Sequence, residues 1–226
     1  SDININKFPE IMLKRYKKVQ MCRYGENWDQ QGGFYEDIDS PIGLQNMKQL
    51  HGKAISFNNW LDIDSCIQVI SDFEQDFGEH HITSIFKHTT PNGIAVDYET
   101  QLESCKRAFS CDPLSAFGGI WGFNKPLEAE VADYIINEKN VFVEVLLAPD
   151  FEEKALEILK QKQNLRILKV GDLISARKRA LLYEKPEIRG VPGGAIIQEW
   201  DCGDLIKEWD VKTKRKVSES EKNALI

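Results

Sequence analysis

One stretch of the chain, Ser84-Ile85-Phe86-Lys87-His88-Thr89-Thr90-Pro91-Asn92-Gly93, decides how the rest is interpreted. Residues 82–86 are apolar and β-branched, which predicts a short buried strand that ends at Lys87-His88. Thr90 precedes a proline and Asn92-Gly93 is a turn pair, so we expect a loop here. A candidate base and a candidate cation therefore emerge at a strand end, a usual place for a site in an α/β protein. A lysine beside an incidental histidine is also common in ordinary surface loops.

Strands and helices alternate on both sides of this stretch. Helices are predicted around residues 63–73, 98–109, 126–136 and 151–163. Further strands are predicted at residues 119–123, 141–147, 166–170 and 195–198. We expect Asp62 or Asp64 to cap the first helix, and Asp150 with Glu153 to form an approximate capping box on the last. The alternation predicts an α/β fold, with most strands in one largely parallel sheet and helices on both of its faces.

Composition excludes several classes of function. The chain has 226 residues, 42% of them hydrophobic, and a net charge of −7. The absence of a basic block argues against a nucleic-acid or anionic-membrane surface, and no apolar run approaches the roughly 18 residues of a membrane span. The first residues lack the apolar segment of a signal peptide. The five cysteines are scattered without a CxxC pair, which favours free thiols in a reducing cytosol.

Metal-binding patterns are also missing from the sequence. His80-His81 has no second cluster at metal spacing, so exposed polar residues are the better interpretation. Residues 1–18 are polar and are expected to form a linker or a peripheral segment. Residues 19–226 are expected to form one domain, and Ser218 with Glu221 has the spacing of a capping box at its end. This domain boundary is a prediction from composition and from the motifs below.

Five motifs occur in order along the chain. They are Arg23-Tyr24-Gly25-Glu26-Asn27, residues 52–59, Lys87-His88 with Pro91 and Gly93, residues 112–119, and Phe142-Val143-Glu144-Val145 with Ala148-Pro149. Taken together they resemble the aminoimidazole carboxamide ribonucleotide (AICAR) transformylase domain, the C-terminal part of the bifunctional purine biosynthesis proteins. The resemblance is specific over residues 19–150 and looser beyond. It implies that residues 19–226 are the first subdomain, with the second subdomain absent from this sequence.

The resemblance implies a fold and a reaction. The fold is cytidine deaminase-like, a three-layer α/β/α arrangement around a mixed, mostly parallel sheet, and no metal is expected in it. The reaction is formyl transfer from 10-formyltetrahydrofolate, a co-substrate, to the 5-amino group of AICAR. The resemblance also implies a cytoplasmic protein that needs the second subdomain in cis or in trans and forms a homodimer or a hetero-assembly, without nucleic acid or membrane.

Residue roles carry over from the same resemblance. His88 corresponds to the proton acceptor and Lys87 to the residue that stabilises the transition state. The residues that correspond to nucleotide contacts are Arg23, Tyr24, Gly118 and Glu144.

The residue types suit this chemistry. A neutral histidine can take the proton of a weakly nucleophilic amine, and a lysine ammonium can stabilise the oxyanion that forms on the formyl group. Two of the other candidates have simpler interpretations. Glu144, which interrupts an apolar strand, is equally well explained as a salt-bridged residue, and Tyr24 as a packed aromatic with a satisfied hydroxyl.

The chain also departs from the family pattern. Trp28-Asp29 stands where the family usually has proline-histidine, and Thr89-Thr90 differs from the commoner residues there. A second hypothesis is therefore a non-catalytic nucleotide-binding or assembly subunit that kept the fold and lost turnover. A third, a domain of the same class with unrelated chemistry, has the least support in the sequence.

Overall fold

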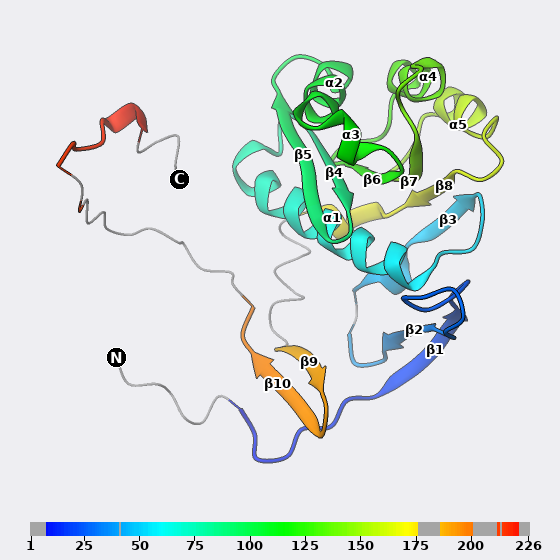
Figure 1. Cartoon of the computed structure of the whole chain (residues 1–226), viewed down its shortest axis with the longest axis vertical. Coiled ribbons are helices and arrows are strands. Elements are labelled where there is room, and N and C mark those ends of the chain that lie inside the picture. The colour runs from blue at the N-terminus through cyan, green and yellow to red at the C-terminus, as the bar shows by residue number, and fades with distance from the viewer. Residues whose placement is uncertain (1–7, 41, 176–185, 201–211, 213, 222–226) are drawn as a thin grey trace. The chain divides into compact units, whose positions relative to one another are not determined.

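A computed structural model describes residues 8–40, 42–175, 186–200, 212 and 214–221 of the chain (Figure 1). The chain divides into two compact units, residues 1–182 and residues 183–226. The candidate site residues all belong to the first unit. Cys202 lies outside the described residues. Of the other cysteines, Cys22, Cys66 and Cys105 are buried, Cys111 is exposed, and all four are free thiols.

A six-stranded sheet forms the centre of the first unit, in the order β3-β8-β7-β6-β4-β5. Its strands are β3 (Lys48–His51), β4 (His81–Lys87), β5 (Thr90–Asp97), β6 (Gly119–Phe123), β7 (Val143–Ala148) and β8 (Arg166–Lys169). β6, β7 and β8 run parallel, whereas β3 is antiparallel to β8, and β4 is antiparallel to both β5 and β6. The predicted strands at residues 82–86, 119–123, 141–147 and 166–170 all lie in this mixed sheet.

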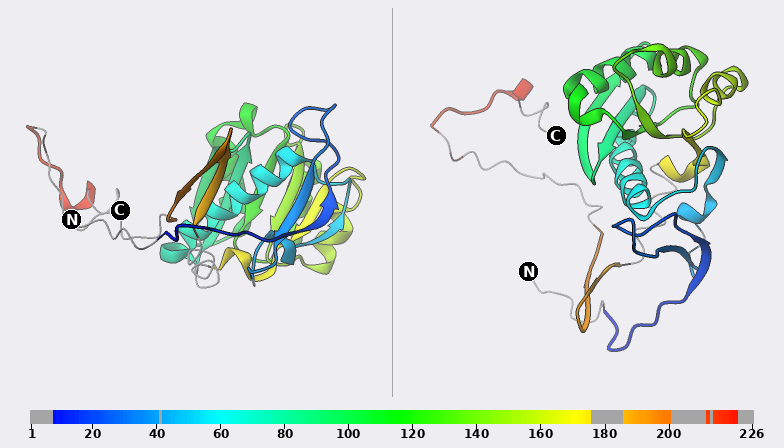
Figure 2. Two further views of the ribbon diagram at one scale, coloured as in Figure 1. Left: turned by 90° about the horizontal axis from the view of Figure 1, so that it is seen from below. Right: turned by 45° about the vertical axis from the view of Figure 1, so that its right-hand side comes forward.

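Helices cover both faces of the sheet, as Figures 1 and 2 show. One face carries α1 (Phe57–Phe77), and the other carries α2 (Gln101–Cys111), α4 (Ala129–Asn137) and α5 (Glu153–Leu159), with the short α3 (Pro113–Ala116) before β6. Adjacent strand residues point to opposite faces, so Ile120 packs with the α1 side and Trp121 with the α2 side. Burying each such large apolar side chain contributes about 1.5–3 kcal/mol. The predicted three-layer α/β/α fold is confirmed.

The helix starts differ from the predicted ones. Ser56, not Asp62 or Asp64, caps α1, and its side chain and that of Asn59 exchange hydrogen bonds with each other's backbone N–H groups. Asp150 does not cap α5, because the helix begins at Glu153 and its N-cap position is Glu152. The Asp150 carboxylate lies 2.5 Å from Lys169 Nζ instead, and this bond holds the pKa of Asp150 below its usual value. The helix near Pro126 begins only at Ala129.

The described residues also form two small hairpins and two short 3-10 turns. In the first unit β1 (Tyr16–Met21) pairs with β2 (Gly33–Asp37), and the 3-10 turns span Leu44–Asn46 and Gly171–Ile174. In the second unit β9 (Glu187–Val191) pairs with β10 (Gly194–Gln198). The strand predicted at residues 195–198 therefore exists but lies outside the main sheet, which contains the other four predicted strands. Its residues are mostly exposed, so this strand offers no apolar face to a sheet core.

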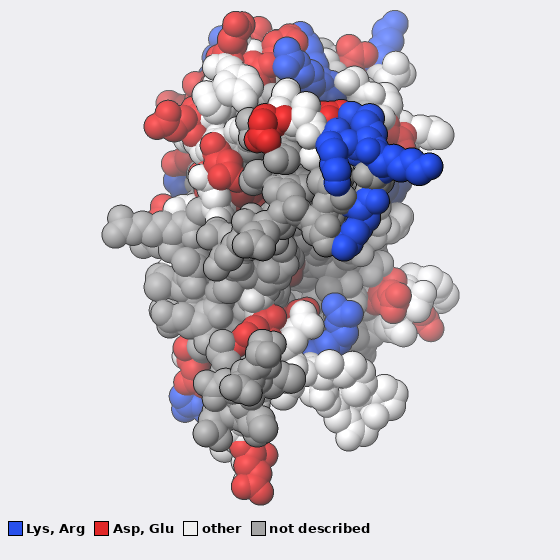
Figure 3. Space-filling view, turned by 90° about the vertical axis from the view of Figure 1, so that its left-hand side faces the viewer, with Lys and Arg blue, Asp and Glu red and all other residues white. Residues whose placement is uncertain are grey.

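The capping box near the end of the chain is confirmed. The Ser218 N–H donates to Glu221 Oε2 at 2.8 Å, and the Glu221 N–H donates to Ser218 Oγ at 3.2 Å. Acidic and basic side chains both occur on the described part of the face drawn in Figure 3. Within the described part of the chain, no helix has the length and apolar character needed to cross a membrane.

Candidate functional site

The β4–β5 hairpin turns at His88-Thr89. Lys87 pairs with Thr90, so only these two residues form the turn, and both have a φ of 56°. Two positive φ values are typical of a type I′ turn. The expected turn at Asn92-Gly93 was wrong, since both residues lie in β5. A Cβ at Gly93 would stand 1.9 Å from the Ala108 carbonyl oxygen, so this glycine serves close packing against α2.

Lys87 reaches the loop that leads into β6. Its Nζ donates to the carbonyl oxygen of Phe117 at 2.8 Å. The next residue, Gly118, has a φ of 75° and donates its N–H to the Phe142 carbonyl at 2.7 Å. The exposed rings of Phe117 and Phe142 lie 5.1 Å apart beside it. Lys87 and Gly118 are thus brought together, and His88, the next residue after Lys87 in the chain, is exposed.

Arg23 and Tyr24 lie on a loop that is fixed to the start of α1. The Arg23 N–H donates to the Ile55 carbonyl at 3.1 Å, and the Phe57 N–H donates to the Tyr24 carbonyl at 3.2 Å. The guanidinium of Arg23 stands 5.5 Å from the centre of the Tyr24 ring. This geometry leaves the charged end of Arg23 exposed, as a side chain that binds an anion requires.

Glu144 lies at the start of β7 and faces two polar partners. Asn59 Nδ2 donates to Glu144 Oε2 at 3.4 Å, and Arg166 Nη1 stands 3.8 Å from the same oxygen. The Arg166 side chain is only 5% exposed. Its Nε donates to the Ala54 carbonyl at 3.1 Å. The salt-bridge interpretation of Glu144 is therefore supported, although 43% of its side chain remains exposed.

The pKa of Arg166 shows which charges surround this pair. Burial lowers that pKa, the carboxylate of Glu144 raises it, the nearby positive charge of Arg23 lowers it, and Tyr24 raises it. Arg23 and Tyr24 therefore lie within electrostatic reach of the Glu144–Arg166 pair. Sequence reasoning missed Asn59 and Arg166. A charged residue within the apolar strand Arg166–Lys169 was the available signal for the second of them.

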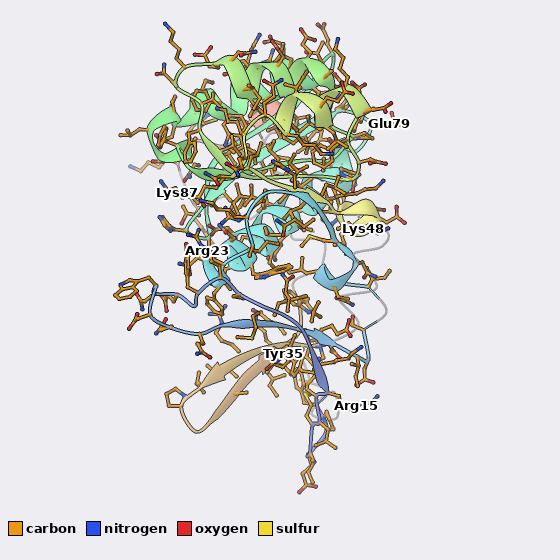
Figure 4. All side chains as sticks on the ribbon, turned by 90° about the vertical axis from the view of Figure 1, so that its right-hand side faces the viewer. Arg15, Arg23, Tyr35, Lys48, Glu79 and Lys87 are labelled. Carbon is orange, nitrogen blue, oxygen red and sulfur yellow. The ribbon has the colours of Figure 1, made fainter. Side chains whose placement is uncertain are left out.

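The candidate residues form two groups, one of Lys87, His88 and Gly118 and one of Arg23, Tyr24 and Glu144. Both groups lie at one margin of the sheet. Phe86 pairs with Ile120, Gly119 with Val143, and Val145 with Arg166, so the end of β4 and the starts of β6, β7 and β8 meet there. These are the amino ends of the three parallel strands, not the carboxyl ends at which open α/β sheets usually bind ligands. In Figure 4 the labelled residues Lys87 and Arg23 lie on the same side of the view.

Helix α1 connects the two groups. Asn59, near its start, contacts Glu144. Asp62 lies three residues further on and accepts a hydrogen bond from the Thr89 N–H at 2.6 Å. Residues three apart share one face of a helix. The same face of α1 therefore contacts both Glu144, a candidate nucleotide contact, and the Lys87-His88 turn.

The surface near the Arg23 loop is hollowed. An open hollow of about 480 Å³ is lined by residues 25–26, residues 30–33 and Phe57. It adjoins Arg23 and Tyr24 in sequence, but Lys87 and His88 do not line it. Among the residues that the structure describes, no group of three His, Cys, Asp or Glu side chains is placed to hold a metal ion.

Comparison with known proteins gives a consistent result. The model of the AICARFT/IMPCHase bienzyme family matches residues 2–226. The bifunctional purine biosynthesis protein purH of Dictyostelium discoideum is 36% identical over 100% of this chain and 41% of its own length. The corresponding protein of Petrotoga mobilis is 37% identical over 99% of this chain and 40% of its own length. The chain thus spans about two fifths of the length of these relatives.

Proposed function

Since the chain belongs to the AICARFT/IMPCHase bienzyme family, we propose that it carries the first part of an AICAR transformylase site in purine biosynthesis. The reaction is formyl transfer from 10-formyltetrahydrofolate to the 5-amino group of AICAR. The observation that supports it best is that the Lys87-His88 turn and the Glu144–Arg166 pair lie at the same sheet margin and that both are contacted by α1. The family name joins two activities, and the lysine-histidine turn favours the transferase over the cyclohydrolase for this segment.

His88 and Lys87 would act on the reacting atoms. As the amine nitrogen attacks the formyl carbon, its proton passes to the neutral imidazole of His88, and the formyl oxygen becomes an oxyanion. The ammonium of Lys87 stabilises that charge. It uses one of its three donors on the Phe117 carbonyl, so two remain for the oxyanion. Collapse of the intermediate breaks the bond to the folate N10, which leaves with a proton.

The second group of residues would hold the ribonucleotide. Arg23 offers an exposed guanidinium, whose two-pronged geometry suits a phosphate, and Tyr24 lies beside it. Glu144 is exposed enough to accept hydrogen bonds from ribose hydroxyls while Asn59 and Arg166 hold its other side. The backbone N–H of Gly118 is engaged with Phe142, so this residue would contribute close approach rather than a donor.

One observation favours the alternative of a non-catalytic nucleotide-binding or assembly subunit. Trp28 stands where the family usually has proline, and 87% of its surface is exposed beside Asp29, where the family has histidine. A large exposed ring at this position suits contact with another protein or subdomain. Under either hypothesis the partners are the second transformylase subdomain and a further copy of the chain, in the cytoplasm.

Reconstitution tests the proposal. Residues 1–226 are assayed with AICAR and 10-formyltetrahydrofolate, alone and with the second transformylase subdomain of a relative supplied in trans. We expect no transfer from the chain alone and measurable tetrahydrofolate release from the pair, because transfer requires prepositioned groups from both parts.

The other outcomes are equally informative. Full transfer by residues 1–226 alone would contradict the half-site. AICAR binding without transfer by the pair would favour the non-catalytic alternative. Ring closure of added formyl-AICAR by the chain alone would assign the cyclohydrolase activity to it instead.

A further inference from the structure

The turn that carries His88 has an unfavourable backbone. His88 and Thr89 both have a φ of 56°, in the left-handed region that glycine and asparagine tolerate best. Type I′ turns normally use Asn-Gly, and neither residue is present here. Non-glycine residues persist in this region only where their surroundings fix them, and they concentrate at functional sites. Something outside the turn must therefore hold it.

Asp62 provides that contact. It lies on α1, is 7% exposed, and accepts the Thr89 N–H on Oδ1 at 2.6 Å. The hydroxyls of Thr89 and Thr90 both donate to the His88 carbonyl, at 2.7 and 3.3 Å, but these bonds lie within the turn itself. A hydrogen bond to a carboxylate is roughly twice as strong as one between neutral groups. Of the side-chain hydrogen bonds that the turn makes within the described part of the chain, the one to Asp62 ties it to a helix.

The geometry points to Asp62 as a positioning residue of the transfer reaction. Its carboxylate fixes the left-handed turn, and the fixed turn sets the direction in which the His88 imidazole leaves the hairpin. Lys87 is fixed separately, through the Phe117 carbonyl. The inference deepens the proposed function, and its catalytic part rests on that function. Its structural part, that Asp62 fixes the turn, can be tested without measuring turnover.

The structural part is tested on the 226-residue chain by NMR. Asp62→Ala removes the acceptor, and Asp62→Asn keeps a neutral oxygen in its place. Asp76→Asn, on an exposed position of the same helix, is the matched control. We expect exchange of the Thr89 amide proton to rise about tenfold or more in Asp62→Ala, less in Asp62→Asn, and not in the control, since a broken hydrogen bond exposes the amide. An unchanged Thr89 amide in Asp62→Ala would overturn the inference.

The catalytic part is tested in the preparation that transfers formyl groups, residues 1–226 with the second subdomain. We expect Asp62→Ala to lower kcat about 10- to 100-fold, because misplacement of a catalytic group by about 1 Å costs that much. The KM for AICAR should stay within about twofold of the parent value, because Asp62 contacts the turn and not the candidate nucleotide-binding residues. Asp76→Asn should match the parent in both constants.

A rescue variant separates positioning from general stability. Thr89→Gly removes the strain at the second turn position, so the turn needs less support from outside. In Asp62→Ala/Thr89→Gly we expect kcat to recover at least about threefold relative to Asp62→Ala, a coupling of the kind that double-mutant cycles detect. The positioning role would be overturned if Thr89→Gly restored no kcat and the loss of kcat paralleled a fall in the melting temperature. If the parent pair transfers nothing, the proposed function fails, and the amide exchange still decides whether Asp62 holds the turn.

Discussion

The described hairpins β4–β5 and β9–β10 both have two-residue turns, but different residues form them. In β9–β10 the turn contains Pro192 and Gly193, where Gly193 has a φ of 82° and no atom within 4 Å of where its Cβ would be. In β4–β5 the turn contains His88 and Thr89, both in the left-handed region. Such a conformation costs a non-glycine residue about 1–2 kcal/mol, and glycine almost nothing. The difference fits the proposed role of His88, because a glycine at this position could not supply an imidazole.

The β4–β5 hairpin does contain a glycine, but in a strand. Gly93 lies in β5 where the Ala108 carbonyl of α2 leaves no room for a Cβ. Pro91 precedes it on the same strand, which is tolerated because β5 is at the edge of the sheet. The hairpin thus places its glycine at a packing contact and its strained residues at the turn. Substitutions at the turn and at Gly93 test these two placements separately.

The largest effect is expected from His88→Gly. It removes the proposed proton acceptor, so formyl transfer by residues 1–226 with the second subdomain should fall about 10²–10⁴-fold, the usual range for a lost general base. The same change relieves the left-handed strain, so the free energy of unfolding should rise by about 1 kcal/mol. Turnover assays and urea unfolding of the same preparation measure the two effects.

Both parts of that prediction have a clear contrary result. Unchanged turnover would remove His88 from the mechanism. A loss of stability in His88→Gly would mean that the imidazole contributes to the fold, which its exposed position does not suggest. His88→Ala serves as the control, since it loses the imidazole but keeps the strain.

A smaller effect is expected from Gly93→Ala. The added Cβ would lie 1.9 Å from a backbone oxygen of α2, so strand and helix must move apart. Overpacking of this kind typically costs about 1–3 kcal/mol. Urea unfolding should show this loss. Stability within about 0.5 kcal/mol of the parent would show that α2 shifts freely and would remove the reason for glycine in this strand.

The sequence predicted the regular parts of the molecule because periodicity encodes them. The apolar runs over residues 82–86 and 141–147 identified buried strands correctly, since alternation and β-branching reflect local burial. The turn was misplaced because Asn92-Gly93 is the stronger local signal, and a tertiary contact with α2 overrides it. Capping by Asp62 was wrong because α1 begins earlier, at Phe57 with Ser56 as its cap, so Asp62 lies inside the helix and its carboxylate contacts the Thr89 N–H.

The candidate site was predictable only in part. The family motifs supplied Lys87, His88, Arg23 and Glu144, and the structure brings these into two groups at one margin. Asn59 lies in the motif at residues 52–59 and Arg166 in a predicted strand, but neither was identified as a site residue, because their importance depends on which strands and helices are neighbours. Contacts such as Asn59 with Glu144, 85 positions apart in the chain, arise from topology that single-sequence periodicity does not contain.

A local effect is expected from Gly193→Ala in the other hairpin. Its φ of 82° lies in the region that disfavours a Cβ, although the space around it is open. The change should therefore cost about 1 kcal/mol through backbone strain alone. Amide exchange in β9 and β10 should accelerate about fivefold, and the main sheet should be unaffected. Equal acceleration in both sheets would contradict a local cost.

The smallest effect concerns the open end of the β4–β5 hairpin, where a second buried carboxylate lies. Asp97 Oδ1 accepts the N–H groups of Glu99 and Thr100, each at 2.9 Å, and Oδ2 lies 3.1 Å from Arg107. The hydrogen bonds from Thr100 and Glu99, followed by the charge of Arg107, hold the pKa of Asp97 below its usual value. A carboxylate with a depressed folded-state pKa stabilises the fold above its unfolded pKa of about 3.9.

This contribution is lost as the pH falls below about 4 and through the folded-state pKa. We therefore expect Asp97→Asn to lower the free energy of unfolding at pH 7, and the difference from the parent to shrink as the pH is lowered from about 5 to 3. Urea unfolding of both chains at each pH measures it, with Asp76→Asn as the exposed control. Parallel pH profiles for the parent and Asp97→Asn would show that the carboxylate does not hold this end. Profiles that converge at low pH would show that the charged carboxylate of Asp97 supports the open end of the hairpin. The turn of the same hairpin is contacted by Asp62.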